Sequence, residues 1–507
     1  MRQTILLQGG RVVDPGTNFD GNADLLIEDG RIAALRPAAP APAADRAEPA
    51  RSDEAGTYQA DTIVDARGLI IGPGFVDLHS HVHSIAGQRL QACDGVTTAL
   101  DLEAGLMPIT RAFADASDAG RPLNYGFAAS WGGARQQVLT GQAPDASLAG
   151  ALAVLGNPDW QRDSTPGELD AWLDLLRTEL GAGALGIGVL QGYAPRTNPV
   201  EFLAVARLAA EAGVPVFTHV RELVEVDPST PIDGSTELVR AAAETGAHMH
   251  HCHVNSTSRR HVDRVLQLFD RARREGSPVT VEAYPYGAGS TAIGAAFLEP
   301  DVLATWGLTP RSVVLLGSGE RVSDAARLVE LRRGDPGAPC IIEFLDERDP
   351  ADVALLLRAL QHPDSMVASD AMPVYWDDGA HDTRDWPLPP GGRTHPRTAG
   401  TFSRAIRLMV RERGAWSWTE AFRRCAYLPA RVLDTAAPAA RRKGHLGIGA
   451  DADVVVLDPG SVADRATYTD PTRPSAGVQH LLVGGEFVIR DGQLLAAAYP
   501  GQAVRTG

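Results

Sequence analysis

The sequence is short of cysteine and of long apolar runs. Its four cysteines, Cys93, Cys252, Cys340 and Cys425, lie far apart, so neither a disulfide framework nor a thiolate zinc knuckle is expected. No apolar run is long enough to cross a bilayer, and the N-terminal segment lacks the apolar region and the cleavage site of a signal peptide. We therefore expect a cytoplasmic protein whose cysteines are small buried side chains.

Basic runs are also absent, and the formal net charge is −16. An acidic chain without a basic cluster is not expected to bind nucleic acid or an anionic membrane. An anionic small molecule would need positive charge concentrated at its own site. With 507 residues, of which 44% are hydrophobic, the chain can bury a large core and exceeds the usual length of a one-domain barrel. An appended domain is therefore expected.

The two ends of the chain share a pattern of short strand-like runs separated by Gly and Asp turns. These runs lie at residues 5–7, 23–27, 31–35, 453–457 and 480–482. We expect residues 1–72 and 436–507 to combine into one small β-sandwich domain. Residues 37–56 are rich in proline, alanine and charged side chains, a composition that buries little apolar surface, and they predict a mobile loop.

The middle of the chain, residues 73–435, alternates short apolar strands with amphipathic helices, as βα units in a parallel sheet do. Eight strands are expected, at residues 75–78, 97–102, 124–129, 185–190, 215–218, 248–253, 279–284 and 366–369. The predicted fold class is α/β, with a closed TIM-like (β/α)8 barrel. About eighty residues separate Tyr286 from Met366, more than one crossover helix needs, so an inserted subdomain is expected at about 290–345.

Histidines stand at the ends of several expected strands. The run Phe-Val-Asp-Leu ends in His79 and His81, whose spacing puts both side chains on one face. His219 closes a second apolar run, at 214–218. Imidazoles and carboxylates from separate strand ends of a barrel can meet at one point and hold zinc. We therefore predict these three histidines as metal ligands, over a chance His-x-His or a core histidine, and His83 as a supporting residue.

The strand at 248–253 carries several histidines, so its alternation does not choose between its two faces. His253 is predicted as the ligand because it is last in the strand. His251, beneath it, stays the alternative.

Two carboxylates complete the predicted site. Glu103 follows the strand at 97–102 and could bridge two metal ions, with Asp101 as the competing candidate. Asp370 follows the strand at 366–369 and is predicted as the catalytic base, although an aspartate there could instead cap a helix. Many binuclear metal hydrolases bridge their metals with a carbamylated barrel lysine. The one lysine of this sequence, Lys443, lies well after the last expected barrel strand, so no lysine can have that role.

At this point the sequence resembles the amidohydrolase superfamily, and within it the D-aminoacylase branch of N-acyl-D-amino-acid deacylases, including those that act on N-acyl-D-glutamate. Segments general to the superfamily are Gly-Pro-Gly-Phe-Val-Asp-Leu-His-Ser-His at 72–81 and Gly-Val-Thr-Thr at 95–98. Segments typical of the branch are Tyr-Pro-Tyr at 284–286 and His-Pro-Arg-Thr-Ala-Gly-Thr-Phe at 395–402. The resemblance spans nearly the whole chain.

The chain departs from the branch at two positions. Relatives often have a cysteine metal ligand after the second barrel strand, where this chain has Glu103 as its replacement. Many also have a lysine, thought to meet the substrate carboxylate, where this chain has Asn255.

Other residues must therefore recognise the substrate carboxylate. Arg221 and Arg397 are the predicted cations, since a guanidinium holds a carboxylate bidentately. Arg221 could equally form a salt bridge to Glu222 or Glu225. Tyr284, Tyr286 and Ser290 are expected to add hydroxyl groups, although either tyrosine could instead be a core side chain.

The resemblance implies a zinc-dependent hydrolase, with one or two ions, that cleaves the linear amide of N-acyl amino acids, of D configuration, to a carboxylic acid and a free amino acid. Two alternatives stay open: a cyclic-amide hydrolase of the hydantoinase or dihydroorotase kind, and a catalytically silent barrel that serves as a scaffold. The expected partner is the small-molecule substrate. Whether the chain forms a homo-oligomer is open.

Overall fold

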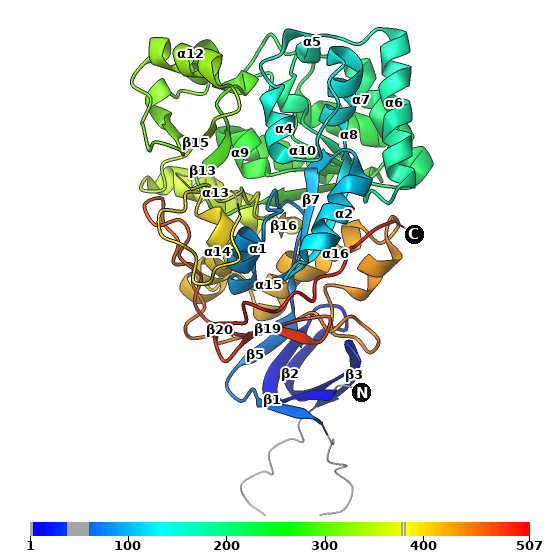
Figure 1. The fold of residues 1–507 in the computed structure, drawn as a ribbon, viewed down its shortest axis with the longest axis vertical. Coiled ribbons are helices and arrows are strands. Elements are labelled where there is room, and N and C mark those ends of the chain that lie inside the picture. Colours follow the sequence, from blue (N-terminus) through cyan, green and yellow to red (C-terminus); the bar gives the residue numbers. More distant parts are fainter. Residues whose placement is uncertain (1–3, 38–59, 377–378, 380–381, 507) are drawn as a thin grey trace, which may run out of the picture.

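The protein folds into a barrel body joined to a smaller β-domain, which lies at the lower end of Figure 1. The computed structural model describes residues 4–37, 60–376, 379 and 382–506. The loop predicted at 37–56 lies outside the described residues, apart from Pro37. The α/β fold class predicted from the sequence is confirmed.

Strands from the two ends of the chain form one nine-stranded mixed sheet with a hydrophobic core of its own. The N-terminal end contributes β1 (Thr4–Asp14), β2 (Phe19–Glu28), β3 (Arg31–Pro37), β4 (Thr62–Asp65) and β5 (Ile70–Pro73). The C-terminal end contributes β17 (Val454–Leu457), β18 (Val478–Val483), β19 (Glu486–Arg490) and β20 (Gln493–Leu494). The sheet is continuous because β5 pairs with β1 on one side and with β17 on the other.

The β2–β3 hairpin shows how local sequence sets this sheet. Its two-residue turn, Asp29 and Gly30, has φ values of 48° and 75°. Turns of this kind need positive φ at both central positions, which Asp-Gly tolerates and most residues do not. The turn holds the hairpin in register so that Leu25 and Ile27 are buried in the core of the β-domain.

The barrel is an eight-stranded parallel sheet that contains every strand predicted from the sequence. Its strands are β6 (Phe75–Asp77), β7 (Val96–Leu106), β8 (Asn124–Ser130), β9 (Ile187–Val189), β10 (Val216–Thr218), β11 (Met249–His251), β12 (Val279–Ala283) and β16 (Ser365–Val367). A parallel bridge between Ser80 and Ala371 connects the segments that follow β6 and β16, so the sheet closes on itself.

Helices follow the barrel strands along the chain. They are α1 (Ile85–Cys93), α2 (Ile109–Ala119), α3 (Trp131–Arg135), α4 (Leu148–Ala153), α5 (Pro158–Gln161), α6 (Pro166–Gly181), α7 (Pro199–Ala212), α8 (Gly234–Thr245), α9 (Val254–Ser258), α10 (Val262–Arg274), α13 (Pro350–Gln361), α14 (Arg397–Ile406), α15 (Trp418–Phe422) and α16 (Leu428–Val432). Helix α6 begins with Pro166 and a capping box between Thr165 and Glu168, which satisfies backbone N–H groups that the first turn leaves free.

An additional three-stranded antiparallel sheet lies between β12 and β16 in sequence, where the long interval predicted an insertion. It consists of β13 (Ala288–Ala292), β14 (Val313–Leu315) and β15 (Pro339–Glu343), with α11 (Pro300–Thr305) and α12 (Ala325–Gly334) between its strands. Figure 1 shows it at the upper left. Helix α13 then returns the chain to the barrel.

Lys443 joins the β-domain to the barrel. Its Nζ donates to Oδ2 of Asp451 over 3.0 Å and to Oδ2 of Asp453 over 2.7 Å. Oδ2 of Asp453 also accepts from the side chain of Asn124, the first residue of β8, over 3.0 Å. Lys443 therefore has a structural role where the β-domain meets the barrel.

Among the described residues, none of the helices combines the length and the apolar content needed to span a bilayer.

Candidate metal centre

Side chains from five barrel strands meet at the end of the barrel where the strands terminate. His79 and His81 follow β6, Glu103 lies within β7, His219 follows β10, His253 follows β11 and Asp370 follows β16. All six are buried. The carboxyl ends of parallel strands point to one face of a barrel, so the fold brings together every residue that the sequence predicted for the metal and for the base.

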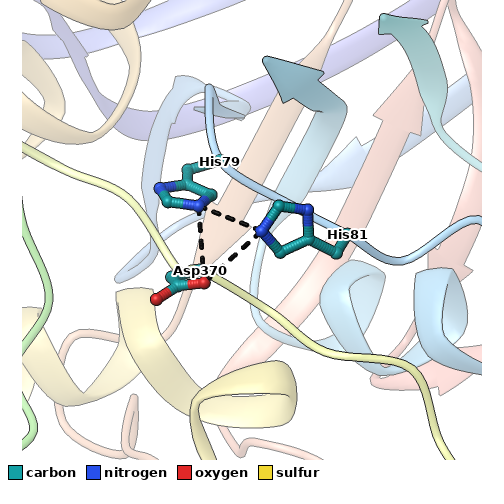
Figure 2. Close-up of side chains that lie close together, drawn as sticks. All are labelled: His79, His81 and Asp370. Carbon is teal, nitrogen blue, oxygen red and sulfur yellow. Dashed lines mark hydrogen bonds and ion pairs between the residues drawn. The ribbon is translucent and has the colours of Figure 1, made fainter. Parts of the chain in front are cut away.

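The first group consists of His79, His81 and Asp370, whose facing atoms Figure 2 joins with dashed lines. Nε2 of His79 lies 3.1 Å from Nε2 of His81. Oδ1 of Asp370 lies 3.4 Å from the first of these nitrogens and 3.6 Å from the second. The three atoms therefore surround one point, as ligands of a single ion do.

Glu103 lies between this group and a second pair of histidines. Its Oε2 is 3.1 Å from Nε2 of His79 and 3.6 Å from Nε2 of His81. Its Oε1 is 2.7 Å from Nε2 of His253 and 3.2 Å from Nδ1 of His219. Each carboxylate oxygen thus faces a different histidine pair, which is the arrangement that a bridging ligand needs.

Two buried carboxylates orient the first histidine pair from behind. Oε1 of Glu282, in β12, accepts from Nδ1 of His79 over 2.6 Å, and Oε2 of Glu282 lies 3.0 Å from Nε2 of His250. Oδ1 of Asp101 lies 3.2 Å from Nδ1 of His81. A histidine that donates from Nδ1 turns the lone pair of Nε2 toward the site.

The competing candidates take other positions. Asp101 supports His81 and also lies 2.8 Å from Nε2 of His83, so both of these residues stand behind the ligand group. His251 faces Ser235 and the backbone oxygen of Cys252, away from Glu103. His253, in contrast, faces Glu103, and the geometry favours it over His251.

Backbone conformation at two of the site residues is unusual. His253 has φ 34° and Asp370 has φ 51°. Left-handed values are uncommon for residues other than glycine and concentrate at functional sites, where surrounding structure holds them. Both residues stand shortly after a barrel strand, His253 two residues after β11 and Asp370 three residues after β16.

Carboxylates and imidazoles of the cluster shift one another's pKa values. Burial by itself raises the pKa of Glu103, but the neighbouring histidines, His79 foremost, hold it well below its usual range. Burial lowers the pKa of His81, and Asp101 more than offsets this, so that pKa rises to about 9. The pKa of His79 is also raised, because the nearby carboxylates outweigh the effect of burial. Protons on His79 and His81 can therefore balance the carboxylates, and a divalent cation would replace those protons.

The donor set fits zinc. Imidazole nitrogens and carboxylate oxygens are ligands that zinc takes in proteins. Two overlapping groups of residues each bring their donor atoms within 4.8 Å of one another. The first group is His79, His81 and Asp370, and the second is His79, Glu103 and His253. Nδ1 of His253 is buried without a hydrogen-bond partner. These groups are therefore arranged to hold a cation.

The residues predicted to bind substrate divide into two sets. Tyr284 and Ser290 line the cavity that contains His81, Glu103, His219, His253 and Asp370. Arg397 lies behind this wall, where its Nη2 is 2.9 Å from Oδ2 of Asp370 and its guanidinium covers the ring of Tyr284 at 4.9 Å.

Arg221 and Tyr286 are not among the residues that line this cavity. Nε of Arg221 donates to Glu237 over 2.7 Å, and its Nη1 donates to the backbone of Pro195. The salt bridge considered from the sequence therefore exists, but to a residue of α8 instead of Glu222 or Glu225. The ring of Tyr286 packs under Arg404 at 4.4 Å.

Sequence reasoning missed three residues at the site. Glu282 lies in β12, and a single acidic residue inside an otherwise apolar strand was the signal for it. Tyr193 lines the cavity, and its hydroxyl lies 2.8 Å from Oγ1 of Thr291. Arg259 also lines the cavity, and the run Ser-Arg-Arg gave no sign of this.

The chain is similar to known amide hydrolases over most of its length. A model of the amidohydrolase family matches residues 62–489. The chain is 29% identical to an N-acyl-D-glutamate deacylase of Alcaligenes xylosoxydans xylosoxydans over 95% of this chain and 92% of that one. It is 28% identical to a D-aminoacylase of the same organism, over 95% and 93% of the two chains.

A solved structure is similar over almost the full length. It is the N-acyl-D-glutamate deacylase from Bordetella bronchiseptica, in complex with zinc and a phosphonate inhibitor that mimics the tetrahedral intermediate. The match has a TM-score of 0.74 and 26% sequence identity, and it covers 99% of each chain.

Proposed function

This chain belongs to the amidohydrolase family, and we propose that it hydrolyses the linear amide bond of N-acyl-D-amino acids to a carboxylic acid and a free amino acid. Its relation to N-acyl-D-amino-acid deacylases extends over nearly the whole chain, as the sequence motifs predicted. The observation that carries the proposal is Glu103, whose two oxygens each face one histidine pair at the barrel mouth.

The residues that would hold zinc follow from these contacts. His79, His81 and Asp370 would bind one ion, His219 and His253 a second, and Glu103 would bridge the two. Zinc held there would supply a Lewis acid for the amide carbonyl and for water. Glu103 would take the bridging role that a carbamylated lysine has in other binuclear hydrolases.

Asp370 is proposed as the residue that moves the proton. Its Oδ2 is held by Arg397 and its Oδ1 faces the histidine pair, so Oδ1 is the atom that can accept a proton from the attacking water. The same oxygen would return the proton to the amide nitrogen, because an amine leaves poorly unless it is protonated. Arg397 fixes the rotation of the carboxylate during both transfers.

Tyr284 is proposed to donate to the substrate carboxylate, and Arg397, behind the cavity wall, to supply positive charge there. Ser290 lines the same wall, but its hydroxyl donates to the backbone oxygen of Cys340 over 3.1 Å. Nε and Nη1 of Arg397 are buried without a hydrogen-bond partner, and its Nη2 lies 3.2 Å from the backbone oxygen of Ser290. A Cβ at Gly289 would lie 3.2 Å from the Tyr284 hydroxyl and 3.6 Å from Nη1 of Arg397. Donor groups therefore gather over a glycine of the cavity wall. Arg221 and Tyr286 do not line the cavity, and their polar groups bond to Glu237 and to the backbone oxygen of Pro396.

The test is release of free amine from matched N-acetyl-D and N-acetyl-L amino acids, with and without added zinc. The proposal expects zinc-dependent turnover of the D series. Turnover of neither series by zinc-loaded protein would refute it, and hydantoin and dihydroorotate would then be the substrates to assay.

A further inference from the structure

One wall of the cavity is a column of stacked planar side chains that starts at a proposed metal ligand. The ring of His219 lies parallel to that of Phe297, with centroids 5.5 Å apart and planes 9° apart. Phe297 in turn stacks on Trp306, with centroids 5.7 Å apart and planes 16° apart. The guanidinium of Arg259 covers the ring of Trp306 at 3.6 Å. The insertion between β12 and β16 supplies both aromatic residues of this column.

Apolar side chains also line the cavity, beside polar residues such as Ser256 and Thr257. Leu148, Leu152, Leu190, Ile342 and Met372 line the same cavity. Leu148 and Leu152 belong to α4, and Ile342 belongs to β15 of the inserted sheet. A substrate group that enters this space exchanges water for hydrocarbon, which favours an apolar group and opposes an unpaired charge.

Arg259 is the one arginine among the described residues that line the cavity, and its charge is already matched. Its Nη2 donates to Oε2 of Glu222 over 2.6 Å, and its Nη1 donates to the backbone oxygen of Ser256 over 3.1 Å. Glu222 lines the cavity as well, so an anionic substrate group near the pair would meet a carboxylate together with the cation.

The contacts of Arg259 hold it in a strained conformation. Its backbone has φ 47°, a left-handed value that arginine rarely adopts. Such a conformation persists where contacts with the surrounding structure stabilise it, and Arg259 has such contacts with Trp306, Glu222 and Ser256. The guanidinium is therefore fixed against the end of the aromatic column.

We propose that this cavity selects substrates whose amino-acid side chain is large and apolar, and that Glu222 excludes acidic side chains by neutralising Arg259. This inference rests on the proposed function and specifies its substrate class. It separates this chain from the N-acyl-D-glutamate and N-acyl-D-aspartate deacylases that it resembles.

The first measurement compares kcat/KM for N-acetyl-D-leucine and N-acetyl-D-aspartate, whose side chains have similar size but different charge. We expect at least a hundredfold preference for leucine. Along the series alanine, aminobutyrate and norvaline, each added methylene should raise kcat/KM by about fourfold, which corresponds to about 0.8 kcal/mol. Equal or faster turnover of the aspartate derivative would overturn the proposal.

The second measurement uses Glu222→Gln, which leaves the charge of Arg259 unbalanced. The leucine-to-aspartate ratio of kcat/KM should fall by at least tenfold in this variant. Glu225→Gln is the matched control, because Glu225 lies on the same loop but pairs with Arg264 at the surface. An unchanged ratio in a folded Glu222→Gln protein would contradict the role of Glu222. If that variant does not fold, the wild-type ratio still decides the substrate class.

Calorimetric binding of the free amino acids separates this inference from the proposed function. If no N-acetyl amino acid is hydrolysed, the proposed function fails, but tighter binding of D-leucine than of D-aspartate by the zinc-loaded protein would still support the apolar cavity. Tighter binding of D-aspartate, or no binding of either amino acid, would overturn it.

Discussion

Oδ2 of Asp370 lies 2.9 Å from Nη2 of Arg397 in an ion pair, while Oδ1 faces the imidazoles of His79 and His81. The two oxygens of one carboxylate thus face different partners, and only one of them is directed at the place where water and an amide would react.

Replacing Asp370 with asparagine should remove turnover while the protein keeps its fold and most of its metal. Asparagine retains an oxygen that can face the histidines but cannot accept the proton, and proton transfer by a positioned side chain is worth about 10²–10⁴-fold in rate. Metal analysis and rate assays on the same preparation measure both effects. An active Asp370→Asn protein would refute the assignment of the base.

Replacing Glu103 with alanine should remove metal as well as activity, because both histidine pairs lose the carboxylate that faces them. Inductively coupled plasma mass spectrometry of dialysed protein would show the loss. Glu244→Ala is a suitable control, since Glu244 forms an exposed pair with Arg240. Full metal content in Glu103→Ala would exclude bridging by this residue.

Glu282→Gln tests the support behind His79. Glutamine can still occupy the space but cannot hold the imidazole with a full negative charge, and losses of this kind weaken metal binding by about 10–100-fold. Competition with a chromophoric chelator would measure the zinc affinity. An affinity equal to that of the wild type would mean that other contacts already fix the imidazole.

Removing metal should lower thermal stability. Zinc binds the folded cluster and has little affinity for separated ligands, so zinc at a hundred times its Kd adds about 2.7 kcal/mol to the free energy of unfolding. Differential scanning calorimetry after chelation and after zinc titration would show a midpoint that rises with zinc concentration. A midpoint insensitive to zinc would argue against a metal centre.

Lys443→Met should lower the free energy of unfolding by about 3–5 kcal/mol, because it leaves the buried carboxylate of Asp453 without its cation. A substitution of Arg442 is the control, because Arg442 is partly exposed and pairs with Asp451. Removing an exposed pair costs about 0–1 kcal/mol of unfolding free energy. Urea denaturation of the two variants would separate these effects. Equal losses of unfolding free energy in the two variants would mean that the buried ion pair stabilises the protein no more than the exposed one.

The features predicted well from the sequence were those carried by local pattern. Apolar runs located all eight barrel strands, and the predicted ligands other than Glu103 stand shortly after a strand end, where the fold itself determines their direction. Glu103 was predicted to follow a strand ending at residue 102, but β7 continues to Leu106 and Glu103 lies within it.

Pairings between distant segments were harder to predict. The sequence around Arg221 suggested Glu222 or Glu225 as partners, yet it pairs with Glu237, and Glu222 pairs with Arg259. Glu282 reaches His79 across 203 positions of sequence. Such contacts depend on which barrel strands become neighbours and how loops fold over them, and hydrophobic periodicity carries no information about either.

Burial of the one lysine also has a practical consequence. Lys443 is 6% exposed, so the folded chain offers reagents that acylate ε-amino groups no accessible target. Modification of Lys443 therefore requires the β-domain to open, and the rate at which mass spectrometry detects that single adduct would report how often it does. Trypsin, likewise, would cut the folded chain at arginine alone.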